Sequence, residues 1–284
     1  MSTTGSAGEN RSHLSKSRWG YVIANATEGL ARVVRPPRPS LGRRAFRAAW
    51  RRLLVPGAVS VVVVALSMLF LDQAAYDAVA RLPVGVIDTF NEITDFGRSS
   101  WLLVPAGGVL IALAFLASPA LDHISRAVLA AVAVRAGYVF LGIGVPGLTV
   151  SIVKRWIGRV RPSAAGPFAY EWFSWRPDYA SLPSGHSTAV FAAVVAIGSL
   201  WPRTRPILWA YALLIALSRV IVSAHYSSDV IAGAVCGAFG AVVVREWFAV
   251  RRLAFYVGSD GSVRPLPGPS WTRLKKVART LFAQ

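Results

Sequence analysis

Long apolar runs separated by short polar segments make up most of the chain. Two runs, 53–71 and 101–121, contain no charged residue and reach the length of about 20 residues that a helix needs to cross a bilayer. A third run, 127–153, is interrupted only by Arg135. Three shorter runs reach a similar length when their polar flanks are included: 187–201, 206–222 and 230–244. The pattern predicts an all-α fold, a bundle of six transmembrane helices.

The composition is typical of a membrane protein rather than of a soluble globule. Hydrophobic residues make up 54% of the chain and charged residues 15%, and the mean hydropathy is +0.49. The single cysteine, Cys236, lies inside the sixth predicted span, so no intrachain disulfide is expected. The first apolar run begins too far into the chain for a signal peptide, and we expect it to be retained as a helix.

Basic residues concentrate at the two ends of the chain. The net charge is +18, with eleven of the 31 Lys and Arg residues in 1–52 and eight in 245–284. With six spans, these segments share one side with Arg126, Arg203 and Arg205. Because cytoplasmic segments carry the basic excess, we expect both termini in the cytoplasm. The charge is thus a topology signal, reinforced by anionic headgroups, and nucleic acid is not an expected partner.

The same features divide the chain into three parts: a basic cytoplasmic tail, 1–52, a six-span domain, 53–245, and a second basic tail, 246–284. In the first tail, residues 5–39 indicate a flexible segment with one short amphipathic stretch. In the second, a turn-rich stretch precedes a basic amphipathic segment, Trp271–Phe282, which we expect to be an interfacial helix.

Three polar clusters interrupt the apolar C-terminal half. They read Lys-x6-Arg-Pro ending at Pro162, Pro-Ser-Gly-His ending at His186, and Ser-Arg-x5-His-x3-Asp ending at Asp229. Cations can bind the oxygens of a phosphoryl group, one imidazole can attack phosphorus, and the other can protonate the leaving oxygen. The sequence has no zinc-type, calcium-type or nucleotide-type motif. We therefore expect neither a metal nor a cofactor.

The predicted topology brings the three clusters to one face of the membrane. Span three runs outward to Lys154, and span four runs inward from His186. Span five runs outward to Arg219, and span six begins near Asp229. The catalytic site is therefore predicted at the extracytoplasmic ends of spans three to six.

The first cluster provides two candidate phosphate-binding residues, Lys154 and Arg161. On one helix, residues seven apart project from the same side, about 10 Å apart along the axis. Both side chains would therefore contact the phosphoryl group from the same side. The neighbouring Arg155 and Arg159 are expected to reach lipid headgroups instead. Arg135 is expected either to extend toward the cytoplasmic surface or to pair within the bundle.

The second cluster precedes an apolar helical run. Ser184 and Gly185 are therefore predicted at a helix N-terminus, where free backbone N–H groups and the helix dipole favour phosphate. His186 lies in the first turn beside this anion site. It is the candidate general acid.

The third cluster combines a cation with a His-Asp pair. Arg219 lies near the end of an apolar span, where an ionisable residue usually has a partner, and a substrate phosphate would provide one. His225 and Asp229 are four residues apart, within reach across one turn if residues 225–229 are helical. The carboxylate can hold one ring N–H, which leaves the other nitrogen free as a nucleophile.

Taken together, the clusters resemble the tripartite signature of the type-2 phosphatidic acid phosphatase family, membrane lipid phosphate phosphatases that share an active site with vanadium haloperoxidases. The resemblance covers roughly residues 53–245. It implies that His225 forms a phosphohistidine intermediate and that Asp229 activates it. It also implies that His186 protonates the departing alcohol and that water then cleaves the intermediate, with His186 as base.

These observations predict a metal-independent phosphatase for a membrane lipid monophosphate or diphosphate. Candidate substrates are phosphatidic acid, phosphatidylglycerol phosphate, a polyprenyl diphosphate and a lipid A-type glycolipid; the motifs bind phosphate and do not select the lipid or reveal the oligomeric state. The alternatives are a lipid phosphotransferase and a non-catalytic lipid-binding protein, which intact motifs disfavour. A soluble haloperoxidase is disfavoured by the six spans. The Arg-rich basic set indicates a GC-rich bacterium, hence an inner membrane and a periplasmic site.

Two outer segments flank the predicted site. The segment 72–100 is expected to hold an interfacial helix at 76–82 and a polar turn at 94–98, which either lines the site or only caps the bundle. The loop before Pro183 is rich in aromatic residues and forms either an interfacial belt or a lid over the lipid entrance. Within it, Trp175 and Arg176 are candidate headgroup contacts.

Overall fold

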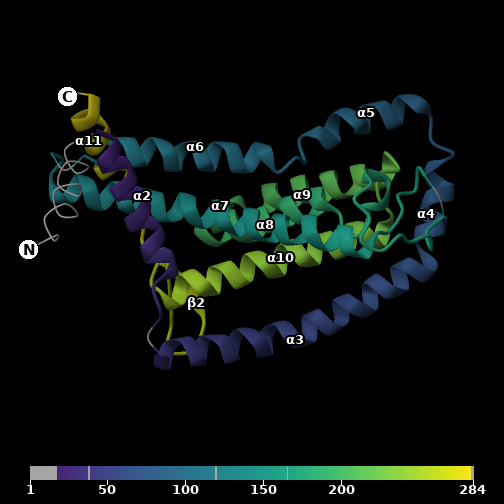
Figure 1. Cartoon of the computed structure of the whole chain (residues 1–284), viewed down its shortest axis with the longest axis horizontal. Helices are drawn as coiled ribbons and strands as arrows, with labels where there is room; N and C mark the ends of the chain where they lie inside the picture. The colour runs from purple at the N-terminus through teal and green to yellow at the C-terminus, as the bar shows by residue number, and fades with distance from the viewer. Residues whose placement is uncertain (1–17, 38, 119, 165, 283–284) are drawn as a thin grey trace, which may run out of the picture.

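Long helices that run along a common axis form an elongated bundle (Figure 1). The structure is a computed structural model that describes residues 18–37, 39–118, 120–164 and 166–282. Residues 5–17 of the expected flexible tail lie outside the described part. Each predicted apolar run falls on a helix, and these helices are α3 (Pro39–Phe70), α6 (Ser100–Leu116), α7 (His123–Ile157), α8 (Gly185–Leu200), α9 (Arg205–Ile221) and α10 (Ser227–Val250).

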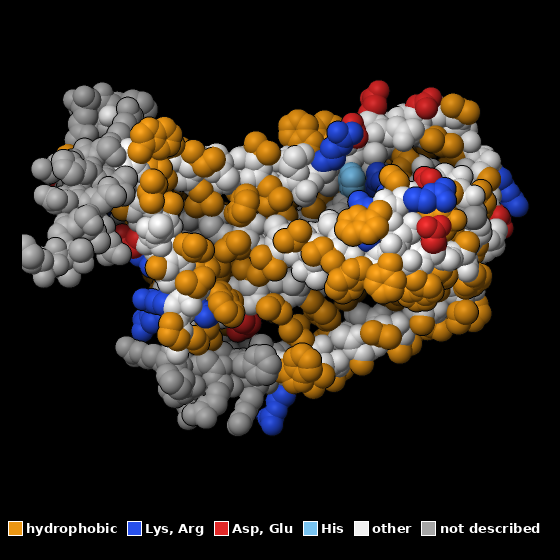
Figure 2. Space-filling view, in the orientation of Figure 1, with side chains coloured by type: hydrophobic (Ala, Val, Ile, Leu, Met, Phe, Trp, Pro, Cys, Tyr) orange, Lys and Arg blue, Asp and Glu red, His pale blue; other side chains and the backbone are white. Residues whose placement is uncertain are grey.

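Five stretches of the described residues are long and apolar enough to cross a membrane. Helix α8 is shorter, because its 16 residues rise only about 24 Å against a hydrocarbon core of roughly 30 Å. Apolar side chains cover most of the visible face of the bundle, as expected for a surface that contacts lipid (Figure 2). The predicted all-α class is thus confirmed, whereas the number of spans stays a prediction.

Helix α7 is the longest element, with 35 residues. It begins after Asp122, whose carboxylate caps it by accepting bonds from the backbone N–H groups of Ile124 (2.8 Å) and Ser125 (3.0 Å). It ends at Ile157 because Gly158 adopts a left-handed conformation with φ +60°. A Cβ at this position would collide with the carbonyl oxygen of Glu171.

Helix α8 lies at the centre of the bundle, packed against α7, α9 and α10. Small side chains such as Ala192 and Ala196 are fully buried along it, so the neighbouring backbones approach closely. Gly233 and Gly237 of α10 face the carbonyl oxygens of Ser184 and Thr188, where a Cβ would collide. The tight contact fixes the start of α8 beside the start of α10.

Short elements close the end of the bundle that lies opposite α2 (Arg18–Val34) and α11 (Trp271–Phe282) (Figure 1). Helix α4 (Asp72–Val79) begins four residues before the expected interfacial helix, and α5 (Val84–Asp95), which was not predicted, packs along α9. The chain then turns at residues 96–99 into α6. The polar turn predicted at 94–98 therefore lies at the end of α5.

The two tails are more ordered than the sequence indicated. Helix α3 starts at Pro39, inside the expected first tail, and α2 extends over 17 residues. A hairpin of β1 (Phe255–Val257) and β2 (Val263–Pro265) buries Phe255 against Tyr138 of α7, with ring centroids 4.6 Å apart. Helix α11 forms at the predicted residues and packs Val277 against α7. Apolar contacts with the bundle thus extend into the second tail.

Candidate active site

His225 lies two residues before α10, and Asp229 lies in the first turn of this helix; a serine links the two side chains. The His225 Nδ1 atom is 3.7 Å from Asp229 Oδ2, beyond a direct hydrogen bond. The Ser181 hydroxyl donates to that same carboxylate oxygen at 2.6 Å and lies 3.4 Å from His225 Nδ1. The backbone N–H of Tyr226 also donates to Asp229 Oδ2, at 3.0 Å. Ser181 therefore bridges the pair.

Burial keeps His225 neutral. Its side chain is only 3% exposed, and this desolvation lowers its pKa from 6.5 to about 4, assisted by the positive charges of Arg219 and Arg161 and opposed by Asp229. A neutral imidazole retains a lone pair. Because Nδ1 faces Ser181 and the carboxylate, the lone pair available for attack is on Nε2.

Asp229 is buried completely and is held from a second side by Arg159. The guanidinium donates to Asp229 Oδ1 at 2.6 Å and to Asp72 Oδ2 at 2.7 Å, and none of these side chains is exposed. Burial alone would lower the pKa of Arg159, but the charges of Asp229 and Asp72 outweigh it and raise the pKa. The prediction that Arg159 reaches lipid headgroups is wrong, because the turn at Gly158 directs the chain inward.

Arg155 has partners within the protein. Its guanidinium donates to the carbonyl oxygen of Trp175 at 2.9 Å and lies over the Trp175 ring, 5.1 Å from its centroid. The side chain thus contacts the aromatic loop of its own chain.

Lys154 and Arg161 do not share a helix, contrary to the prediction. Lys154 lies in the last turn of α7, whereas Arg161 follows the turn at Gly158, with its backbone N–H bonded to the Asp178 carbonyl oxygen at 2.8 Å. The charge of Lys154 is nevertheless within electrostatic range of Arg161 and Arg219. Burial lowers the pKa of the Arg161 guanidinium. Three cations therefore converge, although from three different elements.

The second cluster faces these cations. As predicted, Gly185 begins α8, and Ser184 is the extended residue before it. A Cβ at Gly185 would lie 3.9 Å from Lys154 Nζ, so the lysine extends over the helix start. The Ser184 N–H donates to the carbonyl oxygen of Asp229 at 2.9 Å, which ties the second cluster to the third.

The last turn of α5 and the turn that follows it pack on the site. Thr94 Oγ1 accepts a bond from Arg219 Nη1 at 2.7 Å, while Arg219 Nε is buried and has no bonding partner in the described structure. A Cβ at Gly97 would lie 2.9 Å from His186 Cδ2 and 2.5 Å from Ile215 Cγ2. Of the two possibilities left open by the sequence, the segment therefore lines the site.

His186 and His225 act on each other electrostatically, and the charges of Arg219 and Lys154 also reach His186. At this end of the molecule Figure 2 shows a histidine side chain between basic side chains. The structure thus brings all the candidate residues of the three clusters to one end of the bundle, and no candidate lies elsewhere.

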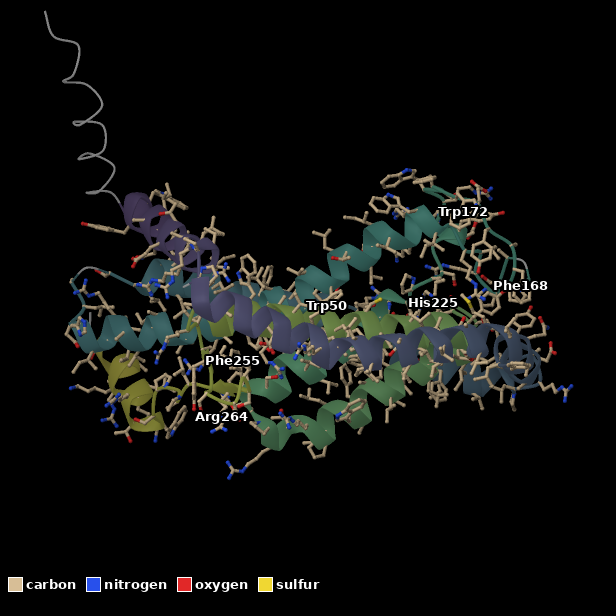
Figure 3. All side chains as sticks on the ribbon, turned by 90° about the horizontal axis from the view of Figure 1, so that it is seen from below. Trp50, Phe168, Trp172, His225, Phe255 and Arg264 are labelled. Atoms are coloured by element: carbon tan, nitrogen blue, oxygen red, sulfur yellow. The ribbon has the colours of Figure 1, made fainter. Side chains whose placement is uncertain are left out.

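The aromatic loop projects beyond this end of the bundle. Phe168, Trp172 and Trp175 are each at least 66% exposed, and Phe168 and Trp172 lie at the same end as His225 (Figure 3). Arg176 stacks on Tyr179, 5.2 Å from the ring centroid. Large exposed aromatic side chains at the end of a membrane bundle are typical of an interface with headgroups.

A cleft of about 340 Å³ opens between α4 and the loop after Arg161, lined among others by Gln73, Tyr76 and Ser163. A small hollow beside it, also lined by Tyr76, reaches His225. Among the described residues, no three His, Cys, Asp or Glu side chains gather where a metal ion could bind. The predicted independence of metals is not tested by this geometry.

Similarity to known proteins agrees with this arrangement. A model of the PAP2 superfamily matches residues 135–253, which contain all three clusters. A Lipid A 1-phosphatase of Rhizobium johnstonii is 34% identical over 227 residues, covering 78% of this chain and 88% of the relative. The chain belongs to the PAP2 superfamily. A Lipid A 1-phosphatase of Rhizobium etli is also 34% identical, over 208 residues, covering 72% of this PAP2 chain and 88% of that protein.

A solved structure is also similar to this PAP2 chain. It is a transmembrane PAP2-type phosphatidylglycerolphosphate phosphatase from Bacillus subtilis, with 21% identity and a TM-score of 0.47, covering 66% of this chain and 92% of that one. Membership of the PAP2 superfamily confirms the resemblance drawn from the motifs. It also confirms the expected class, an integral membrane enzyme that acts as a phosphatase on membrane lipids.

The motifs missed several residues that contact the PAP2 site. Asp72 had one available signal, since a carboxylate that directly follows an apolar span needs a partner. Ser181 lies three residues before Ser184, just outside the second cluster. Thr94 and Arg159 had no local signal, because their partners lie 125 and 70 residues away in the chain.

Proposed function

We propose that this PAP2 protein releases phosphate from a membrane lipid through a phosphohistidine formed on His225, without a metal ion. The main support is the arrangement of His225 and Asp229, in which a neutral imidazole is backed by a buried carboxylate and experiences the positive charges of Arg161 and Arg219. The first candidate substrate is the 1-phosphate of a lipid A-type glycolipid. Its support is the name of the Rhizobium relatives, which align over 88% of their length.

Binding begins with the cations. Lys154, Arg161 and Arg219 would hold the phosphoryl oxygens, with the backbone N–H groups at the start of α8 beneath them. The buried Nε atom of Arg219 has no bonding partner in the described structure and offers a donor for one of these oxygens. A bound phosphate would also offset the positive charge around His186 and so favour its protonated form.

In the first chemical step, Nε2 of His225 attacks phosphorus while the bond between phosphorus and the lipid oxygen breaks. His186 gives its proton to that oxygen, so the lipid leaves as an alcohol. Positive charge develops on the His225 ring as the N–P bond forms, and Asp229 stabilises it through Ser181. The cations stabilise the charge on the equatorial oxygens.

In the second step, water attacks the phosphohistidine. His186, now neutral, takes a proton from this water, the N–P bond breaks, and inorganic phosphate leaves. The hollow that reaches His225 offers one path for the water.

We place the catalytic end in the periplasm of a bacterium and both termini in the cytoplasm. The support is the concentration of Lys and Arg in residues 1–52 and 245–284, together with the position of α2 and α11 at the end opposite α4 (Figure 1). The exposed aromatic loop then lies at the outer interface, where the lipid phosphate would enter.

The test is phosphate release by the purified protein in detergent, with EDTA, from lipid A, phosphatidic acid, phosphatidylglycerol phosphate and undecaprenyl diphosphate. Wild-type protein should release phosphate, most rapidly from lipid A, and His225→Ala should not. His123→Ala is the matched control, because His123 begins α7 at the other end of the bundle and is exposed.

Three results would contradict parts of the proposal. Activity in His225→Ala would exclude the assigned nucleophile, and loss of wild-type activity in EDTA would exclude the metal-free mechanism. Transfer of the phosphoryl group to an added lipid, without free phosphate, would instead identify a phosphotransferase. Labelled lipid phosphate should leave an acid-labile label on the protein that depends on His225.

A further inference from the structure

A second carboxylate lies behind the proposed nucleophile. Asp72, at the start of α4, accepts bonds from the backbone N–H of Ser228 at 2.9 Å and from the Ser228 hydroxyl at 2.6 Å. Its Oδ2 atom also accepts the 2.7 Å bond from Arg159. Neither Asp72 nor Arg159 is a defining position of the three clusters, and the mechanism above uses neither.

The charges of this network do not cancel. Arg159 carries one positive charge, and its two ionic partners, Asp72 and Asp229, carry two negative charges, so one negative charge remains. The side chains are fully buried, so water screens these charges weakly. The excess negative charge lies next to His225, connected to it by Ser181.

This excess matters because the His225 ring becomes positive when it attacks phosphorus. If Arg159 were paired with Asp229 alone, the two would neutralise each other and the ring would lose its counter-charge. Asp72 shares the guanidinium, since Arg159 donates to one carboxylate with Nη1 and to the other with Nη2. The carboxylate of Asp229 is therefore held in place without being neutralised.

We propose that Asp72 and Arg159 are positioning residues that fix Asp229 and set the net negative charge that supports His225 during phosphoryl transfer. The inference rests on the proposed function of His225. In this mechanism α4, which carries none of the motif residues, takes part in catalysis through Asp72. The complete burial of Arg159 then also has a role.

Other titratable groups also interact electrostatically with His225. Arg219 on α9 and Arg161 on the loop after α7 act on it with positive charge, and His186 on α8 interacts with it. The adjacent Tyr226 lies under Arg159, and burial raises the pKa of its phenol to about 12, so it stays neutral between pH 4 and 8. Substitution of Asp72 removes none of these other groups.

Three variants distinguish the effect of charge on catalysis from the effect of hydrogen bonding. Asp72→Asn removes one negative charge at nearly constant shape, and the double variant Asp72→Asn with Arg159→Met restores the original net charge. Ser228→Ala removes bonds to Asp72 and Arg159 without any change of charge. Asp77→Asn is the matched control, because Asp77 is exposed on the same helix.

The full-length protein in detergent is assayed with the lipid phosphate that the wild type cleaves best. We measure kcat, KM, the single-turnover rate of phosphohistidine formation, and the ratio of kcat/KM at pH 4.5 to that at pH 7. Asp72→Asn should slow phosphohistidine formation by about tenfold with KM little changed. Its pH ratio should rise, because loss of negative charge makes His225 harder to protonate. Ser228→Ala and Asp77→Asn should leave the ratio unchanged.

The double variant gives the decisive result. Its pH ratio should return to the wild-type value. If the two substitutions acted only by disturbing the structure, the effect of the second would add to that of the first, and the ratio would not be restored. The inference is overturned if Asp72→Asn keeps its rate within twofold of wild type, if Ser228→Ala matches its pH ratio, or if the double variant does not restore the ratio. Should Asp72→Asn fail to fold, the ratio of the double variant still decides. A wild type that releases no phosphate would instead overturn the proposed function itself.

Discussion

Two arginines, one within helix α7 and one just after it, connect this region to distant segments through different kinds of partner. At the catalytic end, Arg159 bonds to the carboxylates of Asp72 and Asp229. Toward the other end, Arg135 donates to carbonyl oxygens, those of Leu266 at 2.9 Å and Pro267 at 3.0 Å. Both arginines hold the fold together. Only the partners of Arg159 carry negative charge, and they lie beside a residue proposed for catalysis.

The difference shows how a carboxylate partner and a carbonyl partner act differently on an arginine. A carbonyl oxygen satisfies a guanidinium donor, and the net charge of the pair stays positive. A carboxylate also supplies a full charge, which acts strongly where water is excluded. Arg135 thereby fastens the segment after β2 to the bundle. The sequence left two roles open for it, extension toward the cytoplasmic surface and pairing within the bundle, and these bonds are made within the chain. Substitutions at the two ends should therefore change different properties: activity at the catalytic end, stability at the other.

The sharpest test of this comparison is Asp229→Asn. The amide keeps the shape but loses the charge that supports a positive His225 ring, so kcat should fall on the order of a thousandfold. Asp260→Asn is the matched control in the β1–β2 turn, at which no candidate residue lies. Phosphate release at saturating lipid gives both values. If Asp229→Asn lowers kcat by less than tenfold, carboxylate charge does not distinguish the catalytic end of the bundle from the other end.

A smaller effect is expected from Gly97→Ala, which disturbs the catalytic end without any change of charge. The added methyl group would press on His186 and Ile215, and a displaced general acid should lower kcat by about tenfold. Gly85→Ala on α5 is the control, since a Cβ there meets nothing within 4 Å. Equal kinetics in the two variants would show that the turn after α5 does not position His186.

Thr94→Val tests whether the last turn of α5 holds Arg219. Valine keeps the shape but leaves the buried Nη1 group without its 2.7 Å bond, so the arginine should bind phosphate less well. We expect KM to rise about fivefold with a smaller change in kcat. Thr89→Val is the control, because that hydroxyl bonds only to Gly85 of its own exposed helix turn. A fall in kcat at constant KM would argue against a binding role for Arg219.

The sequence predicted those parts of the site that depend on local pattern. The start of α8 at Gly185 and the α11 segment follow from apolar periodicity and flanking polar residues, and the structure places both as expected. The helix end at Ile157 also had a local signal in Gly158. Arg161 lies beyond this turn, whereas its spacing of seven residues from Lys154 predicts that both lie on one helix.

What the local pattern could not predict are pairings between distant segments. Arg155 and Arg159 have the same local setting at the end of an apolar run, yet one contacts a loop and the other becomes fully buried. The deciding partner, Asp72, lies 87 residues away from Arg159. Burial of a charge depends on whether a carboxylate reaches it in three dimensions. Hydropathy along one segment does not contain that information.

The smallest effect on catalysis is expected from Arg135→Met, in the half of α7 that lies away from the catalytic end. The variant loses the bonds to Leu266 and Pro267, so the free energy of unfolding should decrease by about 1 to 2 kcal/mol. The segment 258–269 should become more sensitive to protease. At the same time kcat should stay within twofold of wild type, because Arg135 is not among the groups that act on His225.

Thermal unfolding in detergent, limited proteolysis and phosphate release measure these three quantities on the same preparation. Arg126→Met is the control, because Arg126 is exposed at the same end of α7 and its loss should change none of them. Should Arg135→Met lower kcat as much as Gly97→Ala does, the two ends of α7 would be coupled through the helix. The contrast between carboxylate and carbonyl partners would then not explain where activity is sensitive. Unchanged kcat with reduced stability would show that the arginine at this end serves the fold alone.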